Sequence, residues 1–301
     1  MRSWQQTSTR GDVGTGGRSV AVVSIVTETL VDGLGFPEGP RWHAGRLWFS
    51  DFHQRQVRSV GESGDVRVEL EPDDVPSGLG WDPAGHLLVV CMMRRELVRV
   101  VAERTEVVTD LSPWTVFGAN DMAVDARGRA YIGNFGYDFV NGEEPKPTAL
   151  VMVDEHGRAG PATPPELICP NGIVVDEERR RVVVAETFAH RLSAYELHDD
   201  GTLADRSILA EFEDRVEPDG IAMDDDGEIW IATCSPAVLR VGEDGSITGR
   251  LELSSGLNSY AVALGGDDGT ALYMCSAPGT ARHGTGHGRI EVAKVVRESS
   301  P

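Results

Sequence analysis

One pattern recurs six times along the 301-residue chain and constrains its fold more than any other feature. Each copy contains a short apolar run, a turn of acidic residues and glycine, and a second apolar run that starts 40 to 52 residues after the previous one. Their length, their content of Val, Ile, Trp and Tyr, and the flanking turn residues are typical of strands. The second runs are RLWFSD from Arg46, HLLVVC from His86, RAYIGN from Arg129, RVVVAE from Arg181, EIWIAT from Glu228 and ALYMCS from Ala271.

Further apolar runs complete each repeat. Third runs begin at Arg55, Glu96, Ala149, Arg191, Ala237 and Arg289. Fourth runs are visible in several copies, such as VRVEL from Val66 and ITGRLEL from Ile247. Four strands in a unit of this size match the blades of a β-propeller, which bury their faces by stacking around an axis. We therefore predict an all-β fold, a six-bladed β-propeller with four-stranded blades.

The repeat also favours a single domain over residues 20–301. Two stacked β-domains would need a linker near the middle of the chain, and the two candidates, residues 143–148 and 161–166, fall inside one repeat. The last unit lacks a fourth run, whereas the apolar segment from Val20 to Val31 precedes the first unit. We expect this segment to be the outer strand of the last blade, which closes the ring and removes an exposed edge. The polar, glycine-rich residues 1–19 are expected to form a flexible leader.

Composition excludes several classes of partner. Acidic side chains outnumber basic ones 48 to 28, and a net charge of −20 disfavours binding to nucleic acid or to an anionic membrane. The four cysteines lie far apart and form no CxxC pair, which favours free thiols in a reducing compartment. The sequence has no apolar run of about 18 residues and no secretory signal. We expect a cytoplasmic protein that acts on a small molecule and has no obligatory protein partner.

Six residues open the innermost predicted strands and occupy equivalent places: Glu38, Ser77, Asn120, Asn171, Asp219 and Tyr260. Because innermost strands line the channel of a propeller, these ring residues should surround the axis near one mouth. Four of them, Glu38, Asn120, Asn171 and Asp219, offer carboxylate or amide oxygens, which hard cations prefer. We expect one divalent metal ion, with Ca²⁺ as the first choice and Zn²⁺, Mg²⁺ or Mn²⁺ as alternatives. A simple turn role is the competing interpretation, since Asn, Asp and Gly are common turn residues.

Five stretches of the sequence carry a family resemblance. They are FPEGPRWHAGRLWFSD (36–51), NDMAVDARGRAYIGN (120–134), PNGIVVDEERRRVVVAET (170–187), PDGIAMDDDGEIWIAT (218–233) and VALGGDDGTALYMC (262–275). With them the chain resembles the SMP-30/gluconolactonase/LRE-like family, which includes the regucalcin-like calcium-dependent lactonases. The resemblance implies a six-bladed propeller with a single metal held by Glu38, Asn171 and Asp219. It also implies that Asn120 is a metal ligand or a substrate contact.

A divalent ion with an open position polarises a carbonyl and activates water, which suits hydrolysis of a lactone or related ester. Asp219 and Asn120 are the predicted catalytic residues, with Asp219 as metal ligand and general base. The neighbouring Asp121 is interpreted as a backbone-bonded structural residue, since strand alternation points it away from the channel. No GxSxG motif offers a competing nucleophile. Two other functions remain open: a non-hydrolytic cyclisation or isomerisation at the same metal, and calcium binding without catalysis.

The substrate is expected to be larger and less polar than a sugar lactone. In sugar-lactone hydrolases of the family an arginine commonly stands two residues before the position of Asn120, where this chain has Gly118. The loops expected at the same mouth are rich in aromatic residues, and the predicted substrate contacts are Tyr260, Phe135, Phe117 and Phe188.

Two polar motifs are not assigned to a functional site. His283 and His287 are expected on a flexible glycine-rich loop, and the acidic run from Asp224 to Asp226 is expected to be a hairpin turn.

Overall fold

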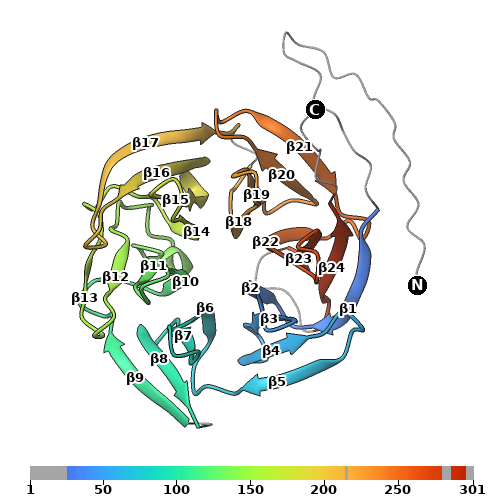
Figure 1. The fold of residues 1–301 in the computed structure, drawn as a ribbon, viewed down its shortest axis with the longest axis horizontal. Coiled ribbons are helices and arrows are strands. Elements are labelled where there is room, and N and C mark those ends of the chain that lie inside the picture. The colour runs from blue at the N-terminus through green and yellow to red at the C-terminus, as the bar shows by residue number, and fades with distance from the viewer. Residues whose placement is uncertain (1–25, 103, 214–215, 280–285, 296–301) are drawn as a thin grey trace.

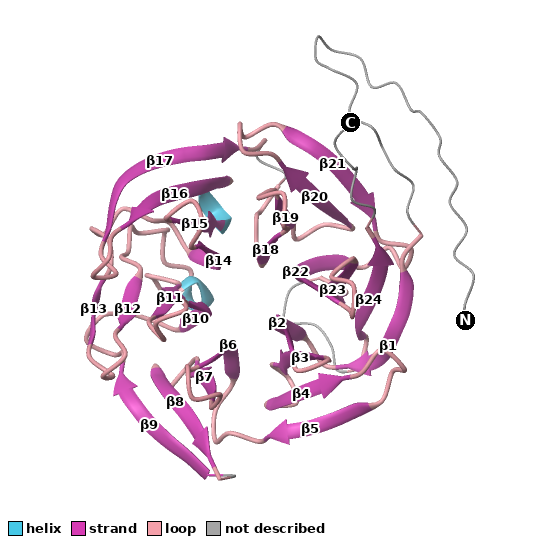
Figure 2. Cartoon of the chain, viewed as in Figure 1, coloured by secondary structure: helices cyan, strands magenta, loops and turns pink. Residues whose placement is uncertain are grey.

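The computed structural model describes residues 26–102, 104–213, 216–279 and 286–295. Within these residues, 24 strands form six four-stranded antiparallel sheets that surround a central axis like blades (Figure 1). Short 3₁₀ helices lie in two of the connecting loops (Figure 2). The predicted all-β, six-bladed propeller is confirmed. The predicted leader, residues 1–19, lies outside the described residues.

In each blade the strands follow one another outward from the axis. Blade 1 consists of β2 (Pro37–His43), β3 (Arg46–Asp51), β4 (Gln56–Val60) and β5 (Val66–Leu70), and blade 2 of β6 (Pro76–Trp81), β7 (Leu87–Cys91), β8 (Glu96–Val101) and β9 (Arg104–Asp110). Blade 3 consists of β10 (Ala119–Val124), β11 (Ala130–Asn134), β12 (Val151–Val153) and β13 (Ala159–Pro161), and blade 4 of β14 (Pro170–Asp176), β15 (Arg181–Glu186), β16 (Arg191–Leu197) and β17 (Leu203–Glu211). Blade 5 consists of β18 (Ile221–Met223), β19 (Ile229–Ala232), β20 (Ala237–Val241) and β21 (Ile247–Glu252). Blade 6 consists of β22 (Asn258–Gly265), β23 (Ala271–Ala277), β24 (Gly288–Lys294) and β1 (Glu28–Leu34).

The middle strands are apolar on both faces because each blade packs against two neighbours. In β15, Val182 and Val184 belong to the buried cluster shared with blade 3, whereas Val183 and Ala185 belong to the cluster shared with blade 5. Six such clusters lie between neighbouring blades. A strand that is covered on both faces has a continuous apolar run in its sequence rather than an alternation of apolar and polar residues. The core is therefore a closed series of interfaces between blades.

The N-terminal strand closes the ring, as the sequence predicts. Strand β1 pairs antiparallel with β24 and occupies the outer edge of blade 6. It runs from Glu28 to Leu34 and so extends past the predicted end at Val31. Leu34 explains the extension, because its side chain is 1% exposed and belongs to the cluster between blades 6 and 1.

The register places two sets of loops at one mouth of the channel. The beginning of an inner strand pairs with the end of the second strand, as in Pro37 with Asp51 and Pro170 with Glu186. The loops before each inner strand therefore lie at the same end as the loops between second and third strands. We call this end the ring mouth. No helix in the described ranges is long and apolar enough to cross a membrane.

Candidate functional site

The predicted ring residues lie where the strand pairing is interrupted. In five of the six blades the register between the inner and second strands shifts at or beside the ring residue, for example between Ala119 and Met122 and between Pro170 and Ile173. A bulge of this kind re-aims a side chain relative to the regular alternation of a strand. In blade 5 the ring residue Asp219 precedes β18, and its backbone N–H donates to Ala232 O at 2.9 Å.

Glycine after a ring residue allows the next blade to come close. A Cβ atom on Gly172 would lie 2.5 Å from Asp219 O, and one on Gly220 would lie 2.4 Å from Ala261 Cβ. The backbones meet directly there, because Gly172 N donates to Asp219 O at 3.3 Å and Gly220 N donates to Tyr260 O at 2.8 Å. These glycines are therefore explained by close approach between blades, which differs from the turn interpretation.

The four predicted oxygen donors have different surroundings. Asn120 and Asp219 are buried, each 6% exposed, whereas Glu38 and Asn171 are half-buried. Asn171 Nδ2 donates to Thr187 Oγ1 at 3.2 Å, and the Asn171 amide lies close enough to Asp219 to lower the pKa of that carboxyl. Glu38 accepts a hydrogen bond from the N–H of Gly39 at 3.1 Å. Asn171 and Asp219 are thus in contact, and Glu38 lies within the electrostatic reach of Asp219.

The two carboxyl groups of the ring have raised pKa values. Burial, followed by the charge of Asp219, raises the pKa of Glu38 well above its ordinary value. Burial also raises the pKa of Asp219 to about 7, although the hydrogen bond from Cys234 acts in the opposite direction. A negative charge on these two carboxyl groups is therefore unfavourable unless a cation balances it.

A divalent cation fits the donors that are present. Among the described residues, Asp219 Oδ1 and Asn120 Nδ2 are buried polar atoms without a hydrogen-bond partner. An amide's oxygen and nitrogen are assigned from its hydrogen bonds, so a half-turn of the unbonded Asn120 amide would present its oxygen at the same place. Buried polar groups normally have a partner, and two carboxylates with two amides form an oxygen set suited to Ca²⁺. No group of three or more His, Cys, Asp or Glu in the described part of the chain could hold a metal, so such a centre needs the two asparagines.

Asp121 is both structural and close to the centre. Its Oδ1 accepts hydrogen bonds from the backbone N–H of Met122 and from Arg41 Nη2, both at 2.8 Å, which agrees with the predicted backbone-bonded role. Its charge nevertheless raises the pKa of Glu38 and of Asp219. The expectation that alternation removes Asp121 from the site is therefore wrong, because the bulge after Ala119 breaks the alternation.

Sequence reasoning missed Cys234 and Thr187. Cys234 Sγ donates to Asp219 Oδ2 at 3.2 Å, and the residue packs against the apolar cluster of Phe36 and Tyr260. Thr187 accepts the hydrogen bond from Asn171 and donates to Pro218 O at 2.9 Å, so it links blades 4 and 5. A lone cysteine and a lone threonine carry no sequence signal, because their contacts with Asp219 and Asn171 join residues that lie 15 and 16 positions apart in the chain.

The predicted substrate contacts fall into two groups. Tyr260 is 6% exposed, its hydroxyl donates to Gly279 O, and its ring centroid lies 4.6 Å from that of Phe36, so it belongs to a packed cluster. Phe117 and Phe135 are half-buried and meet edge to face with centroids 6.0 Å apart. Phe188 is exposed at the ring mouth.

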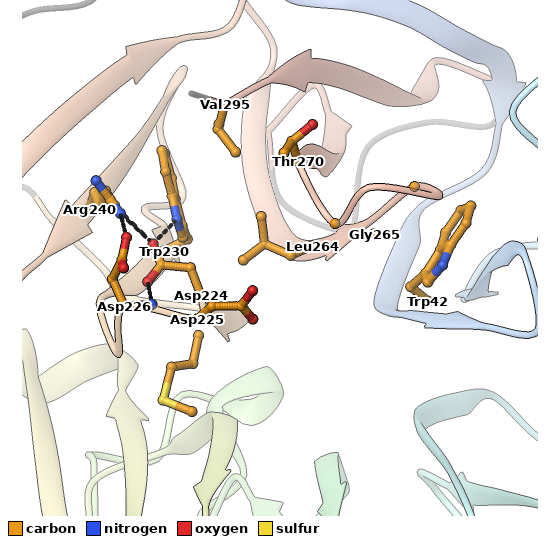
Figure 3. A pocket seen from close by; sticks show the side chains of 13 residues that line it. Trp42, Asp224, Asp225, Asp226, Trp230, Arg240, Leu264, Gly265, Thr270 and Val295 are labelled. Atoms are coloured by element: carbon orange, nitrogen blue, oxygen red, sulfur yellow. Dashed lines mark hydrogen bonds and ion pairs between the residues drawn. The ribbon is translucent and has the colours of Figure 1, made fainter. Parts of the chain in front are cut away.

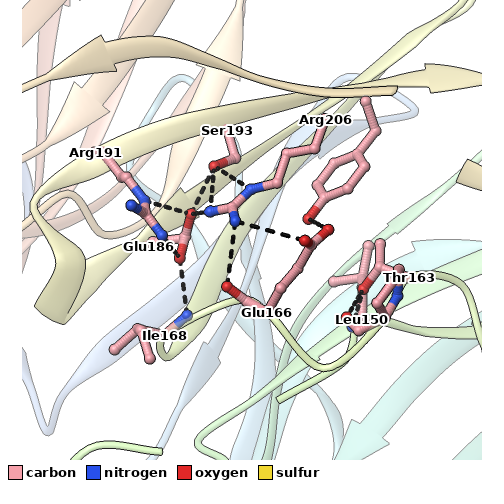
Figure 4. A network of polar contacts seen from close by, with 10 residues as sticks. Leu150, Thr163, Glu166, Ile168, Glu186, Arg191, Ser193 and Arg206 are labelled. Atoms are coloured by element: carbon pink, nitrogen blue, oxygen red, sulfur yellow. Dashed lines mark hydrogen bonds and ion pairs between the residues drawn. The ribbon is translucent and has the colours of Figure 1, made fainter. Parts of the chain in front are cut away.

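A buried ionic network lies in blade 4 (Figure 4). Glu186 is fully buried; its Oε1 accepts from Arg191 Nε at 2.8 Å and from Ser193 at 2.6 Å, and Arg206 also donates to it. Its Oε2 accepts the backbone N–H of Ile168 at 2.8 Å. Burial disfavours the charge, but the hydrogen bonds from Arg191 and Ser193 outweigh it and lower the pKa of Glu186. The network anchors the loop that leads into Asn171.

The acidic run at the opposite end of the propeller forms a hairpin turn. Asp224 Oδ1 accepts the backbone N–H groups of Asp226 and Glu228 at 3.1 and 3.0 Å, while Oδ2 accepts from Trp230 and Arg240. These residues line a cavity of about 300 Å³ that contains none of the ring residues (Figure 3). Of the two histidines in the glycine-rich segment, His287 is exposed and His283 lies outside the described residues.

Comparisons with known proteins agree with the propeller fold. A pentonolactonase of Haloferax volcanii is 28% identical over 270 residues, which cover 87% of this chain and 89% of that protein. A 6-deoxy-6-sulfogluconolactonase of Pseudomonas putida is 31% identical over 163 residues, or 52% of this chain and 53% of that protein. The crystal structure of a calcium-binding protein, regucalcin, from Agrobacterium tumefaciens shares the fold with a TM-score of 0.75 at 19% identity, covering 91% of this chain and 97% of that chain. Residues 36–278 match the SMP-30/Gluconolactonase/LRE-like region, and the chain belongs to this family.

Proposed function

We propose that this protein is a metal-dependent lactonase that opens a lactone or related ester with water. The observation that carries the proposal is the buried, unpartnered Oδ1 of Asp219, whose charge also acts on a second carboxyl group, Glu38. Similarity to two named lactonases over 89% and 53% of their lengths supports the reaction class. Similarity in fold to a calcium-binding protein supports Ca²⁺ as the first metal to test.

Glu38, Asn171, Asp219 and Asn120 are the residues that would hold the cation. A bound divalent ion supplies Lewis-acid polarisation of the lactone carbonyl and lowers the pKa of water. We assign to an Asp219 carboxylate oxygen the proton of the attacking water, and to the Asn120 amide an orienting contact to the substrate. Water adds to the carbonyl, the ring C–O bond breaks, and the product is a hydroxy acid.

Chelation and replacement of one carboxylate test the proposal together. Lactone hydrolysis should disappear after dialysis against EDTA and return with Ca²⁺ or another divalent ion. Asp219→Asn should lower kcat/KM by roughly a hundredfold or more, as expected for loss of a ligand and base. Asp225→Asn removes an exposed carboxylate at the opposite end and should behave as wild type. Turnover that is indifferent to EDTA would contradict metal dependence, and stabilisation by Ca²⁺ without turnover of any lactone would indicate a binding protein.

A further inference from the structure

Apolar side chains are concentrated on one side of the ring mouth. Among the residues that the structure describes, five exposed large apolar side chains lie on its loops, and all five come from blades 2, 3 and 4: Met93 (48% exposed), Trp114 (40%), Val116 (70%), Val140 (51%) and Phe188 (38%). Exposed apolar groups that gather beside a functional centre mark a binding surface, whereas scattered ones need no explanation.

Phe135 lies beside the start of the inner strand that carries Asn120. Ala119 pairs with Asn134, and Phe135 N donates to Gly118 O at 3.1 Å, so Phe135 lies across from Gly118. A Cβ atom on Gly118 would lie 3.1 Å from Phe135 Cδ2 and 3.2 Å from Met92 Cγ. The space that a longer side chain at position 118 would use is therefore filled by an aromatic ring and a thioether, two residues before Asn120.

Phe188 extends the surface to blade 4. It follows Thr187, whose hydroxyl accepts the hydrogen bond from Asn171, so its position relative to the ring residues is fixed. Its ring centroid lies 6.3 Å from that of Tyr137 on the facing loop of blade 3. We call Trp114, Val116, Phe117, Phe135 and Phe188 the apolar sector.

We propose that the apolar sector binds an aliphatic or aromatic substituent of the lactone, so that the preferred substrate is an alkyl- or aryl-substituted lactone rather than a polyhydroxylated sugar lactone. This inference rests on the proposed lactonase function. A lactone that contacts the Asn120 amide would have its substituent near Phe135, which lies across from Gly118, and near Phe188, which follows the partner of Asn171. A polyhydroxylated substrate would leave its hydroxyl groups without partners against these rings, which costs binding free energy, whereas an alkyl chain gains from the same burial.

The test compares two lactones with the same five-membered ring. γ-Nonalactone carries a pentyl chain, and a pentono-1,4-lactone carries hydroxyl groups instead. With Ca²⁺ present, kcat/KM for γ-nonalactone should be higher by roughly tenfold or more, since each buried CH₂ group corresponds to about a fourfold factor. Binding is measured in parallel from the rise in Tm that each lactone causes.

A pair of matched variants tests whether the apolar sector causes the preference for the alkyl lactone. Phe188→Ser should reduce the ratio of the two kcat/KM values several-fold by impairing the alkyl lactone. Ile208→Ser replaces a similarly exposed apolar side chain (43%) on the outer strand β17 and should leave the ratio at its wild-type value. A Phe188→Ser ratio equal to that of wild type would remove Phe188 from the substrate site.

The outcomes separate this inference from the function on which it rests. Hydrolysis with preference for the pentonolactone would overturn the apolar sector and leave the lactonase proposal intact. Absence of hydrolysis, with stronger binding of γ-nonalactone, would contradict the lactonase proposal and support the apolar sector. Absence of any preference in both turnover and binding would overturn the inference.

Discussion

At the scale of single residues, the two carboxylate oxygens of Asp219 have different hydrogen-bonding surroundings. Oδ2 accepts a hydrogen bond from Cys234, while Oδ1 is buried without a partner among the described residues. The thiol therefore fixes the carboxylate in the orientation that leaves Oδ1 available to a cation. Such a supporting hydrogen bond commonly decides how well a ligand is presented.

Replacing Cys234 tests this orientation. Cys234→Val removes the donor and should weaken Ca²⁺ binding by roughly fivefold, the equivalent of about 1 kcal/mol for one hydrogen bond. Cys234→Ser keeps a donor of similar size and should stay near the wild-type affinity. Isothermal titration calorimetry measures both, and equal affinities for Cys234→Val and wild type would contradict the role of the thiol.

The raised pKa values of Glu38 and Asp219 predict a pH-dependent effect of Ca²⁺. A carboxyl whose pKa rises on folding stabilises the folded state fully below its unfolded pKa of about 4, and this contribution is lost as pH rises through the folded pKa. For Asp219 that value is about 7. Because Ca²⁺ binds the ionised groups, the difference in Tm between Ca²⁺ and EDTA should grow as pH rises from about 5 to about 8. Asp219→Asn should flatten this dependence, and a difference that shrinks with pH in wild type would contradict it.

At the scale of elements, the buried ionic network around Glu186 holds the loop that leads into Asn171. Glu186 pairs with Pro170 across the strands and binds the N–H of Ile168, so it holds both sides of the loop that leads into Asn171. Blade 1 uses the same device, because Asp51 ends β3 and accepts the N–H groups of Gly35 and Phe36 before Glu38. In blades 1 and 4, a carboxylate at the end of the second strand thus positions the loop that leads to the ring residue.

Glu186→Gln tests the network. The change leaves Arg191 partly buried without its carboxylate partner, and Arg206 with only the ion pair to Glu166 at 3.8 Å. It should lower the free energy of unfolding by about 3 kcal/mol, as for other broken buried pairs. Glu196→Gln, at an exposed position on β16, should change it by less than about 0.5 kcal/mol. Urea denaturation measures both values, and similar values for the two variants would show that the network adds no stability.

The strands could be predicted from the sequence, whereas the bulges could not. The apolar run of β15 is visible because burial on both faces selects Val and Ala at every position. A bulge such as the one between Ala119 and Met122 depends on the partner strand, so the alternation rule misplaced Asp121. The contact of Cys234 with Asp219 crosses between residues 15 positions apart and has no local pattern. Equivalent positions in the repeat nevertheless predicted the ring residues at or beside the starts of the six inner strands, where the structure has them.

At the scale of the whole molecule, closure of the ring pairs the first strand, β1, with the last strand, β24. Strand β1 supplies the outer edge of blade 6, and Leu34 inserts into the interface between blades 6 and 1. Blade 1 carries Glu38 only a few residues later. The closure therefore also sets the position of a predicted metal ligand.

Leu34→Ala tests the closure. Removing a side chain that is 1% exposed should lower the free energy of unfolding by about 3 kcal/mol, through lost burial and a residual cavity. Asp32→Ala changes an exposed residue of the same strand and should have an effect below about 0.5 kcal/mol. An equally small effect of Leu34→Ala would mean that β1 contributes little to closure.

The central claim is that donors from separate blades hold one divalent cation at the axis. Anomalous diffraction from a crystal grown with Ca²⁺ tests it directly. We predict a single strong peak at the ring mouth, about 2.3–2.6 Å from oxygens of Glu38, Asn171 and Asp219. A crystal with Ca²⁺ bound only elsewhere, or with no peak among these three side chains, would contradict the account.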